Sequence, residues 1–181
     1  MSETLYRLVR DVPDFPRPGI LFRDITPILL SPLALVEAVE LMVKPLRPLN
    51  VTRVAAIESR GFLLGAPVAL ALGVGLAIIR KPGKLPVDKH RVEYALEYGT
   101  DALEIHADAL GAWDRAVIVD DVLATGGTAA AAAELVGRSG ATVAGFGFLI
   151  ELADLDGRRL LGERPVHAVL RYPRPEARTT P

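Results

Sequence analysis

The sequence predicts an α/β fold in which a mainly parallel, twisted sheet is flanked by helices. Short apolar runs typical of buried strands alternate with longer segments of helical periodicity between residues 51 and 150. Strand, helix and strand in succession form βαβ units, which require parallel strands and place helices on both faces of the sheet. With 181 residues, the chain is long enough for one domain, residues 1–181, with a core of its own.

The composition argues against several classes of function. Lys and Arg number 21 and Asp and Glu number 22, so a net charge of −1 favours neither a nucleic acid nor a membrane as partner. The absence of Cys excludes disulfides and thiolate chemistry, and three scattered His residues give a protein-held metal site little support. Residues 1–16 lack the apolar segment of a secretory signal, so a cytoplasmic location is expected.

The N-terminal part of the chain predicts two helices joined by an irregular segment. Apolar residues between positions 5 and 9 indicate a short helix, and the prolines and glycine at positions 13–19 then impose an extended, turning path. Ser31 and Pro32 form a helix start, with a capping hydroxyl followed by proline in the first turn. We expect residues 1–30 to form a small hood beside the sheet.

The middle of the chain predicts a strand at Val54–Ile57, a helix at Phe62–Leu72 and a strand at Gly75–Ile79. Residues 61–79 carry no charge and are long enough to span a membrane. Pro67 and two glycines interrupt this stretch, however, and arginines close both of its ends. We therefore expect a buried helix followed by a buried strand.

The remaining elements follow an exposed loop. Residues 81–91 are charged and contain two prolines and a glycine, which predicts a mobile loop. Alternating patterns on either side of Gly99 and Thr100 predict a hairpin formed by Glu93–Tyr98 and Ala102–His106. The other expected elements are strands at Ala116–Val119, Thr142–Ile150 and His167–Leu170 and a helix at Thr128–Arg138.

The most informative motif joins an apolar strand to a helix. Asp120 and Asp121 follow the strand, and a turn of small residues then leads into the helix: Ala124, Thr125, Gly126, Gly127 and Thr128. Glycines let backbone N–H groups converge, and the positive end of the new helix completes a cradle for a phosphate. The two carboxylates can accept hydrogen bonds from a vicinal diol. The motif therefore predicts a site for ribose 5-phosphate at the carboxyl edge of the sheet.

Two other phosphate-binding motifs do not fit. A Walker A loop requires a lysine after its second glycine, and none follows Gly126 and Gly127. A dinucleotide fingerprint requires a third glycine at the start of a helix, which the glycine pairs at positions 73–75 and 145–147 lack.

The run from Val117 to Thr128 resembles the phosphoribosyl-pyrophosphate (PRPP) signature of type I phosphoribosyltransferases. Four further segments are similar to the adenine phosphoribosyltransferases within this family and occur in the family order: residues 15–26, 58–62, 80–86 and 96–99. The resemblance extends from about Asp11 to Tyr172. It implies the type I phosphoribosyltransferase fold and the conversion of adenine and PRPP to AMP and pyrophosphate.

A user of PRPP must also hold a diphosphate that leaves. Ser59 and Arg60 follow a buried strand and open a helix, so they form a second anion-binding turn. Arg80, Lys81 and Lys84 begin the charged loop, and we expect residues 81–101 to form a mobile catalytic lid that carries these cations to the diphosphate. The resemblance adds Tyr98 as a donor to the same group.

The resemblance also implies how the base is held and activated. Phe22 stacks on the purine, backbone groups of Leu21 and Arg23 read its edge, and Leu152 forms a further wall. Glu97 handles the N7 proton of adenine, and Mg²⁺ arrives with PRPP. The family suggests a homodimer. Two alternatives remain open: a phosphoribosyltransferase for a 6-oxopurine such as hypoxanthine, guanine or xanthine, and a regulator that senses PRPP without catalysis.

Overall fold

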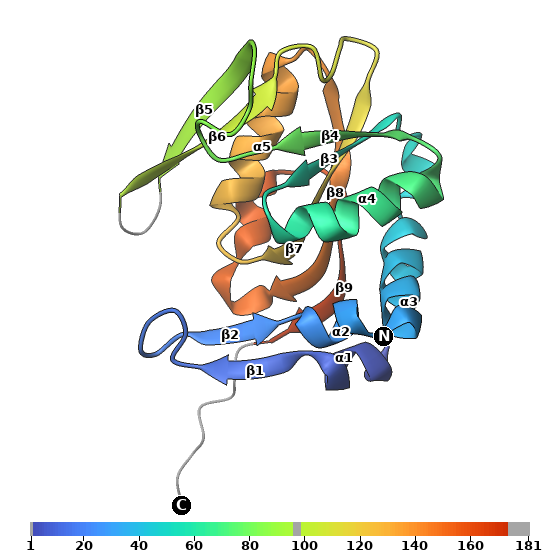
Figure 1. Ribbon diagram of the computed structural model, residues 1–181, viewed down its shortest axis with the longest axis vertical. Helices are drawn as coiled ribbons and strands as arrows, with labels where there is room; N and C mark the ends of the chain where they lie inside the picture. The colour runs from blue at the N-terminus through green and yellow to red at the C-terminus, as the bar shows by residue number, and fades with distance from the viewer. Residues whose placement is uncertain (1, 96–98, 174–181) are drawn as a thin grey trace, which may run out of the picture.

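A five-stranded parallel sheet forms the centre of the computed structural model, which describes residues 2–95 and 99–173 (Figure 1). This confirms the predicted sheet. From one edge to the other, the strands are β4 (Gly75–Ile79), β3 (Arg53–Ile57), β7 (Arg115–Leu123), β8 (Thr142–Leu152) and β9 (Val166–Tyr172).

Helices cover both faces of this sheet, as its apolar strands require. Adjacent residues of β7 show the two sides: Val117 and Val119 pack in one core, whereas Ile118 packs in the other. The first core also holds α1 (Glu3–Leu8), α2 (Thr26–Leu30), α3 (Pro32–Val43) and α4 (Arg60–Leu72). The second core holds α5 (Gly127–Arg138) and the antiparallel hairpin of β5 (Lys89–Ala95) and β6 (Thr100–His106).

Local sequence signals set several of these boundaries. The Ser31 hydroxyl accepts a hydrogen bond from the Ala34 amide at 3.4 Å, and Pro32 begins α3 as predicted. Gly73, at a φ of +71°, ends α4 before β4 begins. The uncharged stretch is therefore a helix and a strand, and in the described part of the chain no helix is both long and apolar enough to cross a membrane.

The N-terminal hood contains a hairpin that the proline-rich sequence did not predict. Strands β1 (Arg10–Pro13) and β2 (Leu21–Asp24) pair antiparallel, with Val12 opposite Phe22. In the intervening turn, the Asp14 carboxylate accepts a hydrogen bond from the Gly19 amide at 2.7 Å. The short helix α2 was also not predicted. The two strands have four residues each and helix α2 has five, which is too short for a clear hydrophobic period in the sequence.

Two predicted boundaries were wrong. The loop expected at residues 81–91 ends earlier, because β5 begins at Lys89, which pairs with His106 of β6. Strand β7 continues through Asp120 and Asp121 to Leu123, because β8 pairs with it as far as Glu151. The hairpin itself is confirmed, although residues 96–98 lie outside the described part of the chain. Three short 3₁₀ helices, η1 (Arg47–Leu49), η2 (Ala153–Leu155) and η3 (Gly157–Leu161), complete the fold.

Candidate active site

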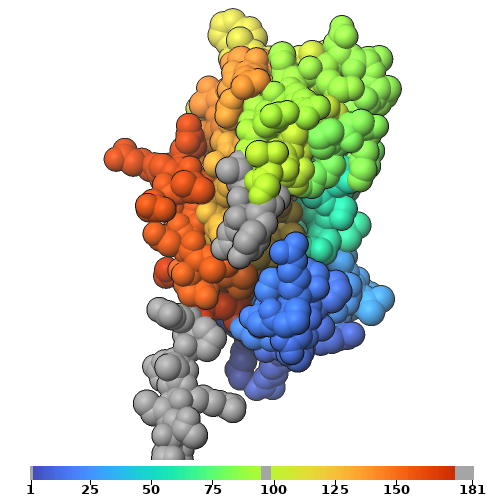
Figure 2. All heavy atoms as spheres, turned by 90° about the vertical axis from the view of Figure 1, so that its left-hand side faces the viewer, coloured from blue at the N-terminus to red at the C-terminus, as the bar shows by residue number. Residues whose placement is uncertain are grey.

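A cavity of about 430 Å³ lies at the carboxyl edge of the sheet, where the hood contributes part of its wall. Figure 2 looks onto this side of the molecule, where the blue hood lies below the green hairpin and the orange C-terminal third borders both. The predicted residues in the cavity wall come from five separate segments and are Leu21, Phe22, Arg23, Ser59, Arg60, Lys81, Asp120, Asp121, Ala124, Thr128 and Leu152. The fold thus brings together most of the predicted site residues.

The two acids at the end of β7 differ in their surroundings. Asp121 is 4% exposed, and its carboxylate accepts a hydrogen bond from the Arg60 Nε at the start of α4. Asp120 lines the cavity and accepts a hydrogen bond from the Asp121 amide at 2.8 Å. Burial raises the pKa of Asp120 well above its ordinary value, and the nearby charge of Asp121 raises it further. The pair can therefore hold a proton as well as accept hydrogen bonds.

The turn after β7 has the geometry of an anion cradle. Gly126 adopts a φ of +86° and serves as the N-cap of α5, which begins at Gly127. A smaller hollow of about 80 Å³ follows this turn and is lined by Thr125, Gly126, Gly127 and Thr128, among others. The first N–H groups of a helix have no intrahelical partner, so the cradle offers donors and a positive dipole to a phosphate.

Phe22 belongs to the cavity wall and to neither core. Its ring is partly buried and contacts the Phe15 ring edge-on, with the ring centroids 5.2 Å apart. The Arg60 guanidinium lies 5.3 Å from the centroid of the same ring. The Arg23 side chain turns to Asp11 and to the Tyr172 ring, 4.1 Å from its centroid. The Phe22 ring therefore lies in the wall of the same cavity as Asp120 and Asp121.

The predicted basic residues do not all reach the cavity. Arg60 and Lys81 line it, but Arg80 and Lys84 are not among its lining residues. The Arg80 Nε donates to Glu58 at 3.1 Å, and the Lys84 ammonium pairs with the other carboxylate oxygen of Glu58. In this conformation Glu58 therefore holds Arg80 and Lys84, and their expected role at the diphosphate stays a prediction.

Three residues that line the cavity were not predicted as site residues, namely Ile20, Glu58 and Val122, and Glu58 is the charged one. Its side chain is 8% exposed at the end of β3, and a cis peptide bond joins it to Ser59. Burial alone would raise the pKa of Glu58, but hydrogen bonds from Lys84, the Lys81 amide and Arg80 lower it. Its position directly before the Ser59–Arg60 turn was the available signal. Glu97 and Tyr98, which were predicted for catalysis and diphosphate binding, lie outside the described residues.

A second hollow, of about 500 Å³, lies between α5 and η3 on another part of the surface. Its two arginines already have partners in the chain: Arg138 binds Glu134, and Arg164 donates to the Leu161 carbonyl. The acid among its described lining residues, Glu134, is already paired with Arg138, so the cavity at the sheet edge, with its adjacent carboxylates, is the better candidate for chemistry.

Comparisons with known proteins identify the family of this chain. The family model for the phosphoribosyl transferase domain matches residues 36–163. The adenine phosphoribosyltransferase of Synechococcus sp. is 54% identical over 168 residues, which cover 93% of this chain and 98% of that protein.

Solved structures show the same relationship. The adenine phosphoribosyltransferase of Thermoanaerobacter pseudethanolicus superposes with a TM-score of 0.92 at 48% identity, covering 94% of this chain and 99% of that one. The Saccharomyces cerevisiae enzyme, in complex with an imino-altritol bisphosphate and adenine, gives a TM-score of 0.86 at 41% identity, covering 93% and 97%. The chain therefore belongs to the phosphoribosyltransferase family and, within this family of pentosyl-transferring enzymes, to the adenine phosphoribosyltransferases.

Proposed function

We propose that this protein transfers the 5-phosphoribosyl group of PRPP to N9 of adenine, which yields AMP and pyrophosphate in purine salvage. The observation that carries the proposal is the composition of one cavity wall. An aromatic ring and two adjacent carboxylates line a space of about 430 Å³, and the glycine-rich helix start lines a hollow of about 80 Å³ that shares Asp120, Ala124 and Thr128 with it. These are the chemical partners of a purine, a ribose diol and a phosphate.

The placement of PRPP follows from the charges. The 5′-phosphate binds the N–H groups of residues 124–128, and the ribose hydroxyls donate to Asp120 and Asp121. The diphosphate lies toward Ser59, Arg60 and Lys81, which line the cavity on the side of β3. The Arg60 contact with Asp121 fixes the distance between the diol site and the diphosphate site. Lys84 and Arg80 reach the diphosphate only after leaving Glu58.

Adenine binds between the hood and the end of β8. Phe22 stacks on the purine, and Leu152 supports it from the end of β8. Among the described residues, strand β2 pairs with β1 alone in its two-stranded sheet, so the backbone of Leu21 and Arg23 has a second edge for the base. A 6-oxopurine reverses the donor and acceptor at positions 6 and 1, and each unpaired buried group costs about 1–3 kcal/mol.

The reaction is a displacement at C1′ with inversion. The N9 lone pair forms the bond to C1′ while the C1′–O bond breaks and its electron pair leaves with pyrophosphate. The N7 proton of adenine passes to the carboxylate of Glu97, and Tyr98 donates to the diphosphate. The transition state resembles an oxocarbenium ion, so water must be excluded, and we assign that role to residues 81–101 as a closing lid. Residues 1–30 supply base recognition.

Magnesium enters as part of the substrate. In residues 2–95 and 99–173, no three His, Asp or Glu side chains are grouped to hold a metal ion. PRPP oxygens and water suit the hard, strongly hydrated Mg²⁺, which neutralises part of the charge of the leaving group. Asp120 and Asp121 then remain available to the ribose.

A homodimer is the proposed assembly, and a cytoplasmic location stays a prediction. Helices α3 and α4 pack together and carry exposed leucines, of which Leu33 is 84% and Leu70 is 82% exposed. Leu30 at the end of α2 and Leu63 in the first turn of α4 are also exposed. A second copy would bury these leucines, and sedimentation would then give twice the chain mass.

The test of function is pyrophosphate release with Mg²⁺ and PRPP and, in separate reactions, adenine, hypoxanthine, guanine or xanthine. We expect turnover with adenine alone. Turnover with a 6-oxopurine instead would keep the PRPP site and contradict the base pocket. Tight PRPP binding without turnover on any base would support the regulator.

A further inference from the structure

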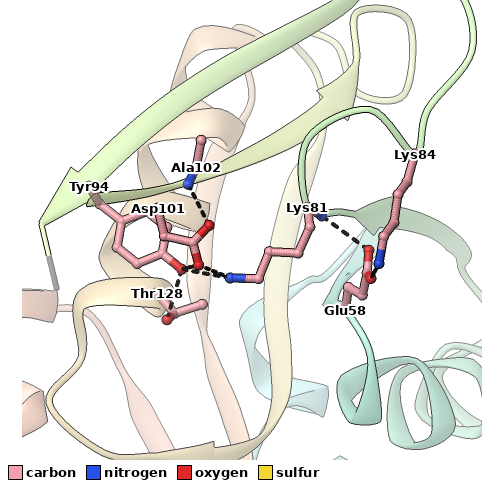
Figure 3. A network of polar contacts seen from close by, with 7 residues as sticks. All are labelled: Glu58, Lys81, Lys84, Tyr94, Asp101, Ala102 and Thr128. Carbon is pink, nitrogen blue, oxygen red and sulfur yellow. Dashed lines mark hydrogen bonds and ion pairs between the residues drawn. The ribbon is translucent and has the colours of Figure 1, made fainter. Parts of the chain in front are cut away.

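The basic residues at the start of the lid pair with two different carboxylates, Glu58 and Asp101 (Figure 3). Glu58 holds the ammonium of Lys84, the Nε of Arg80 and the backbone amide of Lys81. The side chain of Lys81 extends in the other direction, to Asp101 on β6. Of these three cations, Lys81 is the one that lines the cavity. The cation that lines the cavity is thus the one that pairs with Asp101.

The Lys81 ammonium belongs to a small network that reaches the phosphate cradle. It pairs with the Asp101 carboxylate and lies 3.3 Å from the Tyr94 hydroxyl, which is itself 3.3 Å from the same Asp101 oxygen. The Thr128 hydroxyl lies 3.4 Å from the Tyr94 hydroxyl. Thr128 is in the first turn of α5, and Tyr94 and Asp101 face each other across the hairpin. The network therefore connects Lys81, the hairpin of β5 and β6, and the first turn of α5 in the phosphate cradle.

We infer that Asp101 is a positioning residue for PRPP binding: it holds the Lys81 ammonium at the cavity, ready for the diphosphate. This inference rests on the proposed function of the cavity and assigns a role to a residue outside the predicted site. Asp101 does not itself touch the substrate. Its side chain acts through Lys81, and Tyr94 transmits the same restraint to Thr128.

The geometry indicates that Asp101 holds the Lys81 ammonium ready for a ligand and does not withdraw it from the cavity. An ammonium has three N–H donors, and in the described part of the chain its hydrogen-bond partners are Asp101 and Tyr94, so one donor remains for a ligand oxygen. A free lysine loses rotamer entropy when a ligand immobilises it. Asp101 imposes this order before PRPP arrives, so less affinity is lost on binding.

The carboxylate is itself fixed. Its second oxygen accepts a hydrogen bond from the Ala102 amide at 2.8 Å, which sets its orientation on β6. Burial alone would lower the pKa of Lys81, but hydrogen bonds to Asp101 and Tyr94 raise it. Burial likewise opposes the charge of Asp101, but the contact with Lys81 lowers its pKa. Both groups are therefore charged at neutral pH.

The test is a double-mutant cycle with Asp101→Asn and Lys81→Met, read out as the Kd for PRPP by calorimetry and the KM values for PRPP and adenine. Asp101→Asn keeps the side-chain size and removes the charge. We expect it to weaken PRPP binding about 10-fold and to leave the KM for adenine within about 2-fold. In the Lys81→Met background, Asp101→Asn should have no further effect, because the residue it positions is gone.

Glu93→Gln is the matched control, since it removes an exposed carboxylate from the same hairpin. Unchanged or tighter PRPP binding in Asp101→Asn would overturn the inference. So would an equal loss in both backgrounds, or an equal loss for adenine. Should Asp101→Asn fail to fold, Tyr94→Phe removes only the bridging hydroxyl and should weaken PRPP binding in the same Lys81-dependent way. Calorimetry also separates this inference from the proposed function, because PRPP binding is measured without turnover.

Discussion

Replacing Gly126 by Ala should damage both the stability of the fold and the binding of PRPP. Gly126 has a φ of +86°, in the left-handed region that favours glycine. A Cβ atom built on it would lie 2.3 Å from the Gly157 carbonyl oxygen and 3.0 Å from the carbonyl carbon, well inside van der Waals contact. Either η3 or the phosphate cradle must therefore move.

The magnitude has two parts. A non-glycine residue at this φ costs about 1–2 kcal/mol. Forcing a methyl group into packed backbone costs about 1–3 kcal/mol more. The sum is about 2–5 kcal/mol of unfolding free energy, and each kcal/mol corresponds to a Tm loss of about 2–4 °C for a chain of this length.

Gly140→Ala is the matched control for this experiment. Gly140 has a φ of +82°, but the nearest atom to its built Cβ is 3.8 Å away, which is an ordinary contact. Gly140→Ala should therefore lose only the cost of the left-handed backbone, about 1–2 kcal/mol of unfolding free energy, and the variant should keep its affinity for PRPP. Thermal and urea unfolding of both variants measure the stability difference, and calorimetry measures PRPP binding. Equal stability losses, or normal PRPP binding by Gly126→Ala, would refute the close approach of η3 as the constraint on the cradle.

Three further predictions concern charge. Glu97→Gln should reduce kcat strongly and leave PRPP binding nearly intact, because a proton acceptor is lost; near-normal turnover would exclude the proton role. Asp120→Asn should raise the Tm at pH 7, since the raised pKa of Asp120 means that its charge opposes folding there; a lower Tm would contradict this. The pKa values of Glu58, Asp101 and Glu151 are lowered in the fold, so these carboxylates stabilise it fully above their ordinary pKa of about 4. This contribution is lost as the pH falls further. In melting scans from pH 7 to 3, the Tm should therefore decline only at the acid end.

The sheet and its helices, apart from the short helix α2, were predictable because each has its own local signal. The strand at Val54–Ile57, the Ser31–Pro32 helix start and the alanine-rich helix after Gly127 are encoded within a few residues. The acid pair and the glycine turn were predictable for the same reason, since one continuous motif carries them. Strand ends were less predictable: β7 continues past Asp121 because β8 pairs with it there.

Contacts between distant segments could not be derived from the sequence. Asp101 meets Lys81 only because the hairpin register places it opposite Tyr94, and that register depends on packing against α5. Arg60 and Asp121 are 61 positions apart and meet because β3 and β7 are neighbours in the sheet. The division of Arg80, Lys81 and Lys84 between two carboxylates likewise needs three-dimensional geometry.

A crystal structure with AMP bound tests the central claim most directly, because AMP combines the base, ribose and phosphate in one ligand. We predict the phosphate on the N–H groups of residues 124–128, the ribose hydroxyls on Asp120 and Asp121, and the adenine ring against Phe22. AMP with its phosphate at the Ser59–Arg60 turn, or with its base away from the hood, would contradict the assignment of the cavity.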